Sequence, residues 1–320
     1  MKRRILVGVD GGGTKTNFLA VDADTGQQVA TATAGSIHLY TMGAEVATEQ
    51  FRLGLGRLSL GEEDTLIALA VGDPAIDDST VDAGEMLHRE LVDRGICSPE
   101  LPYFGKSDVF MALYAFSYGA PSGLMISGTG SMGVALKESY RHGVFNEVIT
   151  VGGWGDPTPD PGSGYSIAAY GIRAAMDGFD QIAPPTALSK AAVDFFGAKA
   201  SRELADIFAG GRLTRSEIAA FSVKVEEVAE SGDTVACELL RNAGIVLGKY
   251  ACSMLRRIES EQPRLGIYGS VLVRNKRVRK AFDETVYASF PHVKAEIPQH
   301  PPEYGAVRYA ADALLIQLSD

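Results

Sequence analysis

The sequence predicts an α/β protein with two similar lobes, each built on a mixed β-sheet. In Ile5–Val21, two apolar runs of the strand type flank a glycine-rich turn, Asp10–Thr16. The same arrangement recurs at Gly123–Leu136, roughly 120 residues further on, which is about the length of one domain. Strand and helix patterns also alternate after the first hairpin, as they do in α/β folds. Together these observations indicate a duplicated unit.

The two turns have the composition of phosphate-binding loops. Glycine lacks a Cβ, so its backbone N–H can approach an anion closely. Asp10 ends the first strand, where its carboxylate could hold a hydrated Mg²⁺ against a nucleotide phosphate. A plain hairpin with a glycine turn is the alternative, and the Walker pattern Gly-x-x-x-x-Gly-Lys-Ser/Thr is absent. The hydroxyl and cationic groups of the turns are Thr14, Lys15, Thr16, Thr129 and Ser131.

The composition excludes several classes of partner. The 320 residues are 46% hydrophobic and 22% charged, as expected for two globular domains. The net charge of −10 argues against nucleic acid or an anionic membrane as the main partner. No apolar run approaches the roughly 18 residues that span a bilayer. The three scattered cysteines fit free thiols better than a disulfide framework or a metal cluster, so we expect a cytoplasmic protein.

The first lobe should contain five strands, of which the first three precede any helix. Three adjacent strands followed by strand–helix alternation predict a mixed sheet with an antiparallel edge. The expected strands are Ile5–Val9, Phe18–Val21, Val29–Thr33, Leu66–Val71 and Leu101–Phe104, and the expected helices are Ala44–Leu58, Thr80–Arg94 and Val109–Tyr118.

The second lobe begins with strands and becomes mostly helical. Thr214-Arg-Ser-Glu217 is a capping box that opens a helix toward Ser231. The final helix, Tyr304–Leu318, should pack back on the first lobe, so we place the lobes at 1–118 with 304–320 and at 119–303. The other expected helices are Tyr165–Met176, Ala187–Phe196, Asp233–Glu259 and Lys276–Ala288, and the strands are Leu124–Ser127, Gly133–Leu136, Val148–Val151, Leu265–Tyr268 and Val293–Ile297.

Asp108 is the first candidate for chemistry. Lys106-Ser107-Asp108 precedes an apolar run, so Asp108 could be a helix N-cap. It could equally be a general base at the carboxyl end of a strand, where open α/β sheets bind ligands. The two interpretations are compatible, because an N-cap carboxylate keeps a second oxygen free.

The segment Gly152–Tyr165 is the second candidate. It holds the only tryptophan, Trp154, together with Asp156, Asp160 and five glycines. A carboxylate and exposed amides could bind sugar hydroxyls while the ring packs on a sugar face, although a structural turn with a core tryptophan is the alternative. Weaker candidates are Ser36 and His38 after the third strand, and Gly269-Ser270, a small-residue turn suited to an adenine or ribose.

These motifs resemble those of the N-acetylglucosamine kinase/glucosamine kinase family. That family is grouped with the BadF/BadG/BcrA/BcrD-type ATPases in the actin-like superfamily, and the resemblance implies two ribonuclease-H-like lobes with ATP and sugar in the cleft. The resemblance rests on Asp10–Thr16, Ser107-Asp108, Ser127–Ser131, Gly152–Gly155, Asp160–Tyr165 and Tyr268-Gly269, which occur in the family's order.

The resemblance also implies a role for each motif. Asp10 would lie near Mg²⁺, and Asp108 would take the proton from the sugar 6-hydroxyl. Gly269 and Ser270 would lie near the adenosine. The phosphates would be held by Gly11, Gly12, Gly13, Thr14, Lys15 and Thr16 of the first turn and by Gly128, Thr129, Gly130 and Ser131 of the second. The sugar would be bound by Gly153, Trp154 and Asp160, to which we add Ser36 and His38 as candidates.

The expected function is ATP-dependent phosphorylation of an amino sugar. A non-catalytic regulator that responds to nucleotide or sugar on the same scaffold is the alternative, and a homodimer is the candidate assembly. Many relatives carry a glutamate where this chain has Pro161, and N-acetylglucosamine kinases often carry asparagines where it has His38 and Met132. Because Asp156 and Asp160 could offset a protonated amine, the sequence predicts a preference for glucosamine over N-acetylglucosamine.

Overall fold

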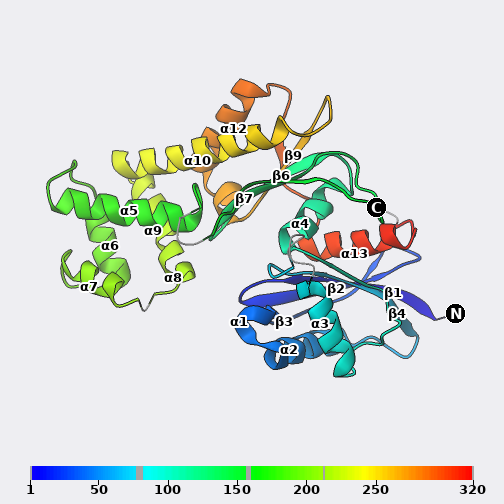
Figure 1. Ribbon diagram of the computed structural model, residues 1–320. Helices are drawn as coiled ribbons and strands as arrows, with labels where there is room; N and C mark the ends of the chain where they lie inside the picture. The colour runs from blue at the N-terminus through cyan, green and yellow to red at the C-terminus, as the bar shows by residue number, and fades with distance from the viewer. Residues whose placement is uncertain (1, 77–81, 156–159, 212, 319–320) are drawn as a thin grey trace. The chain divides into compact units, whose positions relative to one another are not determined.

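The chain divides into two compact units (Figure 1). The computed structural model describes residues 2–76, 82–155, 160–211 and 213–318. Unit 1 consists of Met1–Ala120, Ser139–Asn146 and Pro298–Asp320, and unit 2 consists of Pro121–Glu138 and Glu147–Ile297. Among the described residues, no helix is long and apolar enough to span a bilayer.

Unit 1 contains a five-stranded mixed sheet in the order β3-β2-β1-β4-β5. The first three strands pair antiparallel, whereas β4 and β5 run parallel to β1. The antiparallel edge that the sequence predicts is therefore confirmed. The strands are β1 (Arg3–Gly11), β2 (Lys15–Asp22), β3 (Gln28–Gly35), β4 (Asp64–Gly72) and β5 (Tyr103–Lys106).

Helices cover both faces of this sheet, and Figure 1 shows α2 and α3 on one face and α4 and α13 on the other. Alternation along β1 sends Ile5, Val7 and Val9 into the core shared with α2 and α3. Gly8 faces α13, where a Cβ would lie 2.0 Å from the carbonyl oxygen of Glu303. The absence of a side chain at Gly8 thus lets the last helix rest directly on the central strand. The helices are α1 (Leu39–Met42), α2 (Ala44–Arg57), α3 (Asp82–Asp93), α4 (Asp108–Ser117) and α13 (Pro302–Ala313).

Unit 2 repeats this topology, with the strand order β10-β9-β6-β7-β8. Its first three strands are again antiparallel neighbours, and β9 and β10 are again added in parallel. The two glycine hairpins therefore occupy equivalent positions in two sheets, which confirms the predicted duplication. The strands are β6 (Ser122–Ser127), β7 (Ser131–Leu136), β8 (Val148–Gly152), β9 (Arg264–Tyr268) and β10 (Ala295–Glu296).

The helices of unit 2 form a second core with its sheet. The long helix α10 packs along α12, and small residues such as Gly244 allow the two backbones to approach closely. The helices are α5 (Gly164–Phe179), α6 (Leu188–Phe196), α7 (Glu203–Ala209), α8 (Arg215–Ala219), α9 (Phe221–Glu230), α10 (Thr234–Leu255), α11 (Ser270–Arg274) and α12 (Lys276–Ser289).

Several predicted elements differ in extent. The final helix ends at Ala313 rather than Leu318, because Leu315 takes a positive φ and is exposed, so its side chain gains nothing from continuing the helix. The helix expected from Thr214 to Ser231 is interrupted at Ala220. The last strand covers only Ala295–Glu296, and the long helix ends at Leu255. The sequence does not predict helices α1, α7 and α11, because each is short.

Candidate active site

The first glycine turn joins β1 to β2 at the end of the unit 1 sheet. Gly11 is paired with Thr16, and the N–H of Gly12 donates to the carbonyl oxygen of Lys15 at 2.9 Å. Gly13, Thr14 and Lys15 are exposed at the tip, where an anion could meet backbone N–H groups, a hydroxyl and a cation. Thr16 differs, because it is fully buried and its hydroxyl donates to the carbonyl oxygen of Gly35 at 2.9 Å.

Asp10 lies at the carboxyl end of β1 and Asp108 follows β5, with β4 between these two strands. In the sheet register Asp10 is paired with Gly72 of β4, and Gly72 is paired with Lys106 of β5. Helix α4 then begins at Asp108. Ser107, not Asp108, is the N-cap of α4, since its Oγ accepts from the N–H of Phe110. The N-cap interpretation of Asp108 is therefore wrong, and Asp108 occupies the first turn of the helix.

Both carboxyl groups bind protons more tightly than ordinary aspartates. Burial, together with the nearby charges of Glu303 and Asp108, raises the pKa of Asp10 to about 7, although a hydrogen bond from Asn17 opposes the shift. Burial is also the main cause that raises the pKa of Asp108 to about 6, with a smaller contribution from Asp73. The backbone N–H of Val109 hydrogen-bonds the Asp108 carboxylate and lowers this pKa in part. Two carboxyl groups with raised pKa values therefore lie at the carboxyl end of the unit 1 sheet.

This electrostatic arrangement predicts a pH-dependent stability. A carboxyl whose folded pKa exceeds its unfolded value binds a proton more tightly in the native state, so stability falls as pH rises through the folded pKa. We expect the melting temperature, measured without Mg²⁺ or nucleotide, to fall between pH 4 and 7 because of Asp10. Each kcal/mol should correspond to roughly 2–4 °C. The Asp10→Asn variant should lose this component, and parallel profiles for variant and wild type would contradict the assignment.

The sequence reasoning missed two further carboxylates, Asp73 and Glu303. Asp73 is 2% exposed; its Oδ1 accepts from the N–H of Ala75 at 2.7 Å, whereas Oδ2 has no partner among the described residues. Oδ2 lies beside Gly11, 3.0 Å from where a Cβ of Gly11 would be. In Glu303, Oε2 is likewise buried without a partner among the described residues, and burial raises the pKa of both groups. Asp73 directly follows an apolar strand, just as Asp10 ends one. This position after an apolar strand is the sequence feature by which Asp73 could have been predicted.

The loop after β3 carries Ser36 and His38. Ser36 is buried, and its Oγ accepts from the N–H of His38 at 3.3 Å. The His38 ring is partly exposed, with Nδ1 3.2 Å from the hydroxyl oxygen of Thr41. Its charge lowers the pKa of Asp73 and of Asp108, which places the imidazole in the same electrostatic environment.

In unit 2, the second glycine turn is held by the start of α5. The N–H of Gly164 donates to the carbonyl oxygen of Gly128 at 2.7 Å, and the N–H of Tyr165 donates to that of Thr129 at 3.2 Å. The Ser131 hydroxyl is also occupied, since it donates to the carbonyl oxygen of Pro161 at 2.8 Å. Thr129 is exposed, and Gly130 is partly exposed. The groups that remain open at this turn are thus those of its tip.

Gly269 and Ser270 lie next to the same turn. Gly269 has a φ of 90°, and a Cβ there would lie 2.3 Å from the carbonyl oxygen of Ser127. Ser270 is exposed at the first position of α11. The structure thus brings the predicted adenosine turn to the second phosphate turn within unit 2.

The predicted sugar segment also packs on this turn. Trp154 is 86% exposed rather than part of the core, and Gly153 beside it is exposed. Asp160 is buried and accepts from the guanidinium of Arg215 at 2.8 Å, so its charge is already paired. Asp156 lies outside the described residues. The pairing of Asp160 removes one of the two carboxylates on which the expected glucosamine preference depends.

A magnesium ion fits the residues at the end of β1. The described residues contain no group of three or more histidine, cysteine or acidic side chains placed to hold a metal. Mg²⁺ is usually bound through one or two carboxylates, with water and phosphate completing its shell. A partly buried carboxylate such as Asp10, whose pKa is raised by burial and by neighbouring acids, suits such a cation.

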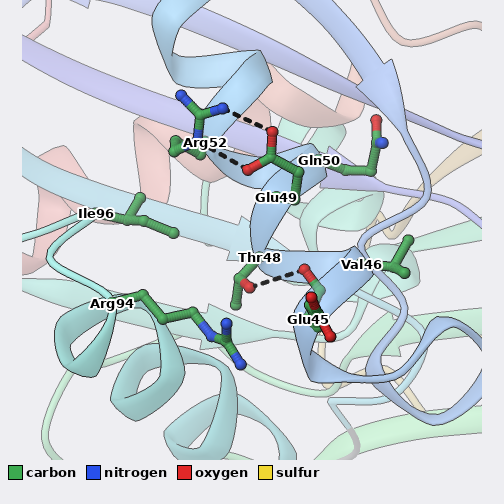
Figure 2. A pocket seen from close by; sticks show the side chains of 8 residues that line it. All are labelled: Glu45, Val46, Thr48, Glu49, Gln50, Arg52, Arg94 and Ile96. Atoms are coloured by element: carbon green, nitrogen blue, oxygen red, sulfur yellow. Dashed lines mark hydrogen bonds and ion pairs between the residues drawn. The ribbon is translucent and has the colours of Figure 1, made fainter.

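A separate hollow on unit 1 lies over α2 (Figure 2). Arg52 is paired there with Glu49 at 2.6 Å, and the Thr48 hydroxyl donates to the carbonyl oxygen of Ala44 at 2.7 Å. Polar side chains of the hollow are thus already hydrogen-bonded within unit 1. None of the predicted site residues lines it; the lining residues are Glu45, Val46, Thr48, Glu49, Gln50, Arg52, Arg94 and Ile96.

The sequence and the fold of this chain are similar to those of known sugar kinases. The chain is 26% identical to the N-acetylmuramic acid/N-acetylglucosamine kinase of Clostridium acetobutylicum, over 95% of this chain and 97% of that protein. It is 24% identical to the N-acetyl-D-glucosamine kinase of Dictyostelium discoideum, over 98% and 99% of the two chains. A crystal structure of a candidate N-acetylglucosamine kinase from Chromobacterium violaceum shares its fold, with a TM-score of 0.67, 23% identity and coverage of 98% and 99%.

The family comparison is the most direct. The family model described as the BadF/BadG/BcrA/BcrD ATPase family matches residues 7–310, a range that begins within β1 and ends within α13. Both glycine turns, Asp108 and the Gly152–Tyr165 segment fall inside this range. The chain therefore belongs to the BadF/BadG/BcrA/BcrD ATPase family.

Proposed function

We propose that this protein is an ATP-dependent sugar kinase whose acceptor is an amino sugar of the N-acetylglucosamine type. The observation that carries the proposal is Asp108, a partly buried carboxyl that follows β5 and whose charge acts on Asp10 at the carboxyl end of β1. Membership of an ATPase family supports ATP as the donor, and the names of the two aligned kinases support the acceptor class.

In this proposal Asp108 is the general base. It accepts the proton of the sugar 6-hydroxyl while that oxygen forms a bond to the γ-phosphorus, and the bond from phosphorus to the bridging oxygen breaks to release ADP. Most of the catalysis in phosphoryl transfer comes from positioning and neutralisation of charge. A carboxyl with a pKa of about 6 is largely ionised at neutral pH, yet it binds a proton better than an exposed aspartate.

The proposal gives the remaining site residues the following roles. Asp10 would hold Mg²⁺, which when bound neutralises charge on the phosphates. The exposed tips of both glycine turns bind phosphate oxygens, with Lys15 as the cation of the first turn. The exposed ring of Trp154 offers an apolar face for a sugar.

The substrate panel is the first test. A coupled assay of ADP release should show turnover with at least one of N-acetylglucosamine, N-acetylmuramic acid, glucosamine and glucose. Turnover with none of these sugars would contradict the kinase proposal and favour a regulator.

We expect N-acetylglucosamine to have a higher kcat/KM than glucosamine. The Asp160 carboxylate is paired with Arg215, so it offers a protonated amine less attraction than the sequence suggested. A buried acetamide left without partners would cost about 1–3 kcal/mol, so backbone groups would have to bind it. The measurement is kcat/KM for the two sugars on one preparation. A clear preference for glucosamine would restore the argument from the acidic side chains.

A further inference from the structure

Both backbone groups of Gly35 are held by side chains from other elements of unit 1. The hydroxyl of Thr16 on β2 donates to its carbonyl oxygen at 2.9 Å. Its own N–H donates to Oε1 of Gln50 on α2 at 2.8 Å. Gly35 is the last residue of β3, and the loop with Ser36 and His38 begins directly after it. The start of the proposed acceptor loop is therefore fixed from two sides.

The same loop also contacts the other end of the first glycine turn. Ile37 is fully buried, and its Cδ1 lies 3.0 Å from where a Cβ of Gly11 would be. Thr16 and Gly11 are paired across the base of the hairpin. Residues 35–37 thus meet both strands that carry the turn, one through a hydrogen bond and the other through packing.

Thr16 itself is sealed from solvent. Its relative exposure is 0%, and its hydroxyl proton is already committed to Gly35, so its side chain cannot meet a phosphate without breaking this contact. Thr14, two residues earlier, is exposed at the tip. The two threonines of one turn therefore have different environments, and only Thr14 is placed to face a ligand.

We propose that Thr16 is a positioning residue that couples the nucleotide turn to the acceptor loop. This inference rests on the proposed function, because it assigns the turn to nucleotide and the loop to sugar. A displacement of the turn by bound nucleotide is transmitted through the Thr16–Gly35 hydrogen bond to Ser36 and His38. Gln50 holds the N–H of the same residue, Gly35, and limits the alternatives open to the loop.

The kinetic test compares two threonines of the same turn. Thr16→Val removes the hydroxyl but keeps the β-branched shape. It should raise the KM for the sugar about 3- to 10-fold, a factor that corresponds to one hydrogen bond, with the KM for ATP changed less than twofold. Thr16→Ser should restore the sugar KM. Thr14→Val should raise the KM for ATP instead. The inference is overturned if Thr16→Val raises the KM for ATP alone, or leaves both values unchanged.

A second measurement keeps the inference testable without any sugar. Amide hydrogen exchange of residues 35–38 is measured with and without a non-hydrolysable ATP analogue and Mg²⁺. In the wild type the nucleotide should slow exchange in this segment, and in Thr16→Val this slowing should disappear. Unchanged exchange in the wild type would refute the coupling, whereas failure of every sugar in the kinase assay would refute only the proposed function.

If Thr16→Val does not fold, Gln50→Leu removes the second side-chain hydrogen bond to Gly35, which comes from α2. It should raise the sugar KM in the same direction, with melting temperatures recorded for each variant. A folded Gln50→Leu protein with wild-type sugar KM and wild-type exchange would count against the coupling.

Discussion

Replacement of Asp108 by asparagine should lower kcat by about 10²–10⁴-fold, the usual contribution of general-base catalysis. Asparagine has nearly the same shape but cannot accept a proton at neutral pH. The variant should fold, because the N-cap of α4 is Ser107 and not Asp108. Burial disfavours the ionised Asp108, so a neutral amide at this position should not reduce stability.

The matched control is Ser107→Ala, one residue earlier. It removes the N-cap hydrogen bond to Phe110, which should cost about 0.5–2 kcal/mol of stability, but it leaves the base in place. Steady-state kinetics and melting temperatures of both variants separate chemistry from helix stability. A folded Asp108→Asn protein with near-normal kcat would remove Asp108 from the mechanism.

The local sequence predicts the hairpins well, because each depends only on residues near to it in the chain. Alternating apolar residues and a glycine cluster specify strand, turn and strand in Ile5–Val21 and again in Gly123–Leu136. The same pattern led to the correct sheet order at the antiparallel edge. The sequence also predicts the parallel strands as strands. Their observed bounds differ from the predicted bounds by a few residues.

Long-range pairings could not be predicted in this way. Asp160 and Arg215 are separated by 55 residues, and nothing near either residue indicates that they meet. Glu303 acts on Asp10 at the carboxyl end of β1 because α13 packs over Gly8. This is a contact between the two ends of the sequence. The burial of Thr16 likewise depends on Gly35, on a different strand. In each case the sequence shows the charged group or the hydroxyl, but it does not show which distant residue that group contacts.

The two glycine turns are alike in sequence yet differ in how the fold uses them. In unit 2 the carbonyl oxygens of Gly128 and Thr129 are taken by the first N–H groups of α5, so the turn is fixed to a helix. In unit 1 the turn is secured through Thr16 and Ile37 to the loop after β3. The second turn is thus held by a 16-residue helix, whereas the first is joined to a loop that carries candidate ligands. Any response to nucleotide is therefore expected to begin in the first turn.

Replacement of Asp10 by alanine should lower kcat/KM for Mg·ATP by about 10²–10³-fold. A metal ion contributes several kcal/mol of charge stabilisation in the transition state, and each 1.36 kcal/mol is a factor of ten in rate. Sugar affinity should stay within twofold of wild type, because the candidate sugar ligands of unit 1 lie on the loop after β3 rather than on β1. The Mg²⁺ concentration for half-maximal rate should rise.

Stability provides the check that the loss is chemical. Burial and the charges of Glu303 and Asp108 disfavour an ionised Asp10, so its removal should leave the melting temperature at neutral pH unchanged or higher. Asp24→Ala is the matched control, since it removes an exposed carboxylate of the same unit that is paired with Arg4. Calorimetric titrations of sugar and of Mg²⁺ with an ATP analogue complete the comparison. If Asp10→Ala lost sugar affinity and kept nucleotide affinity, the nucleotide and acceptor ends of unit 1 would have to be exchanged, and Asp10 would belong to acceptor binding.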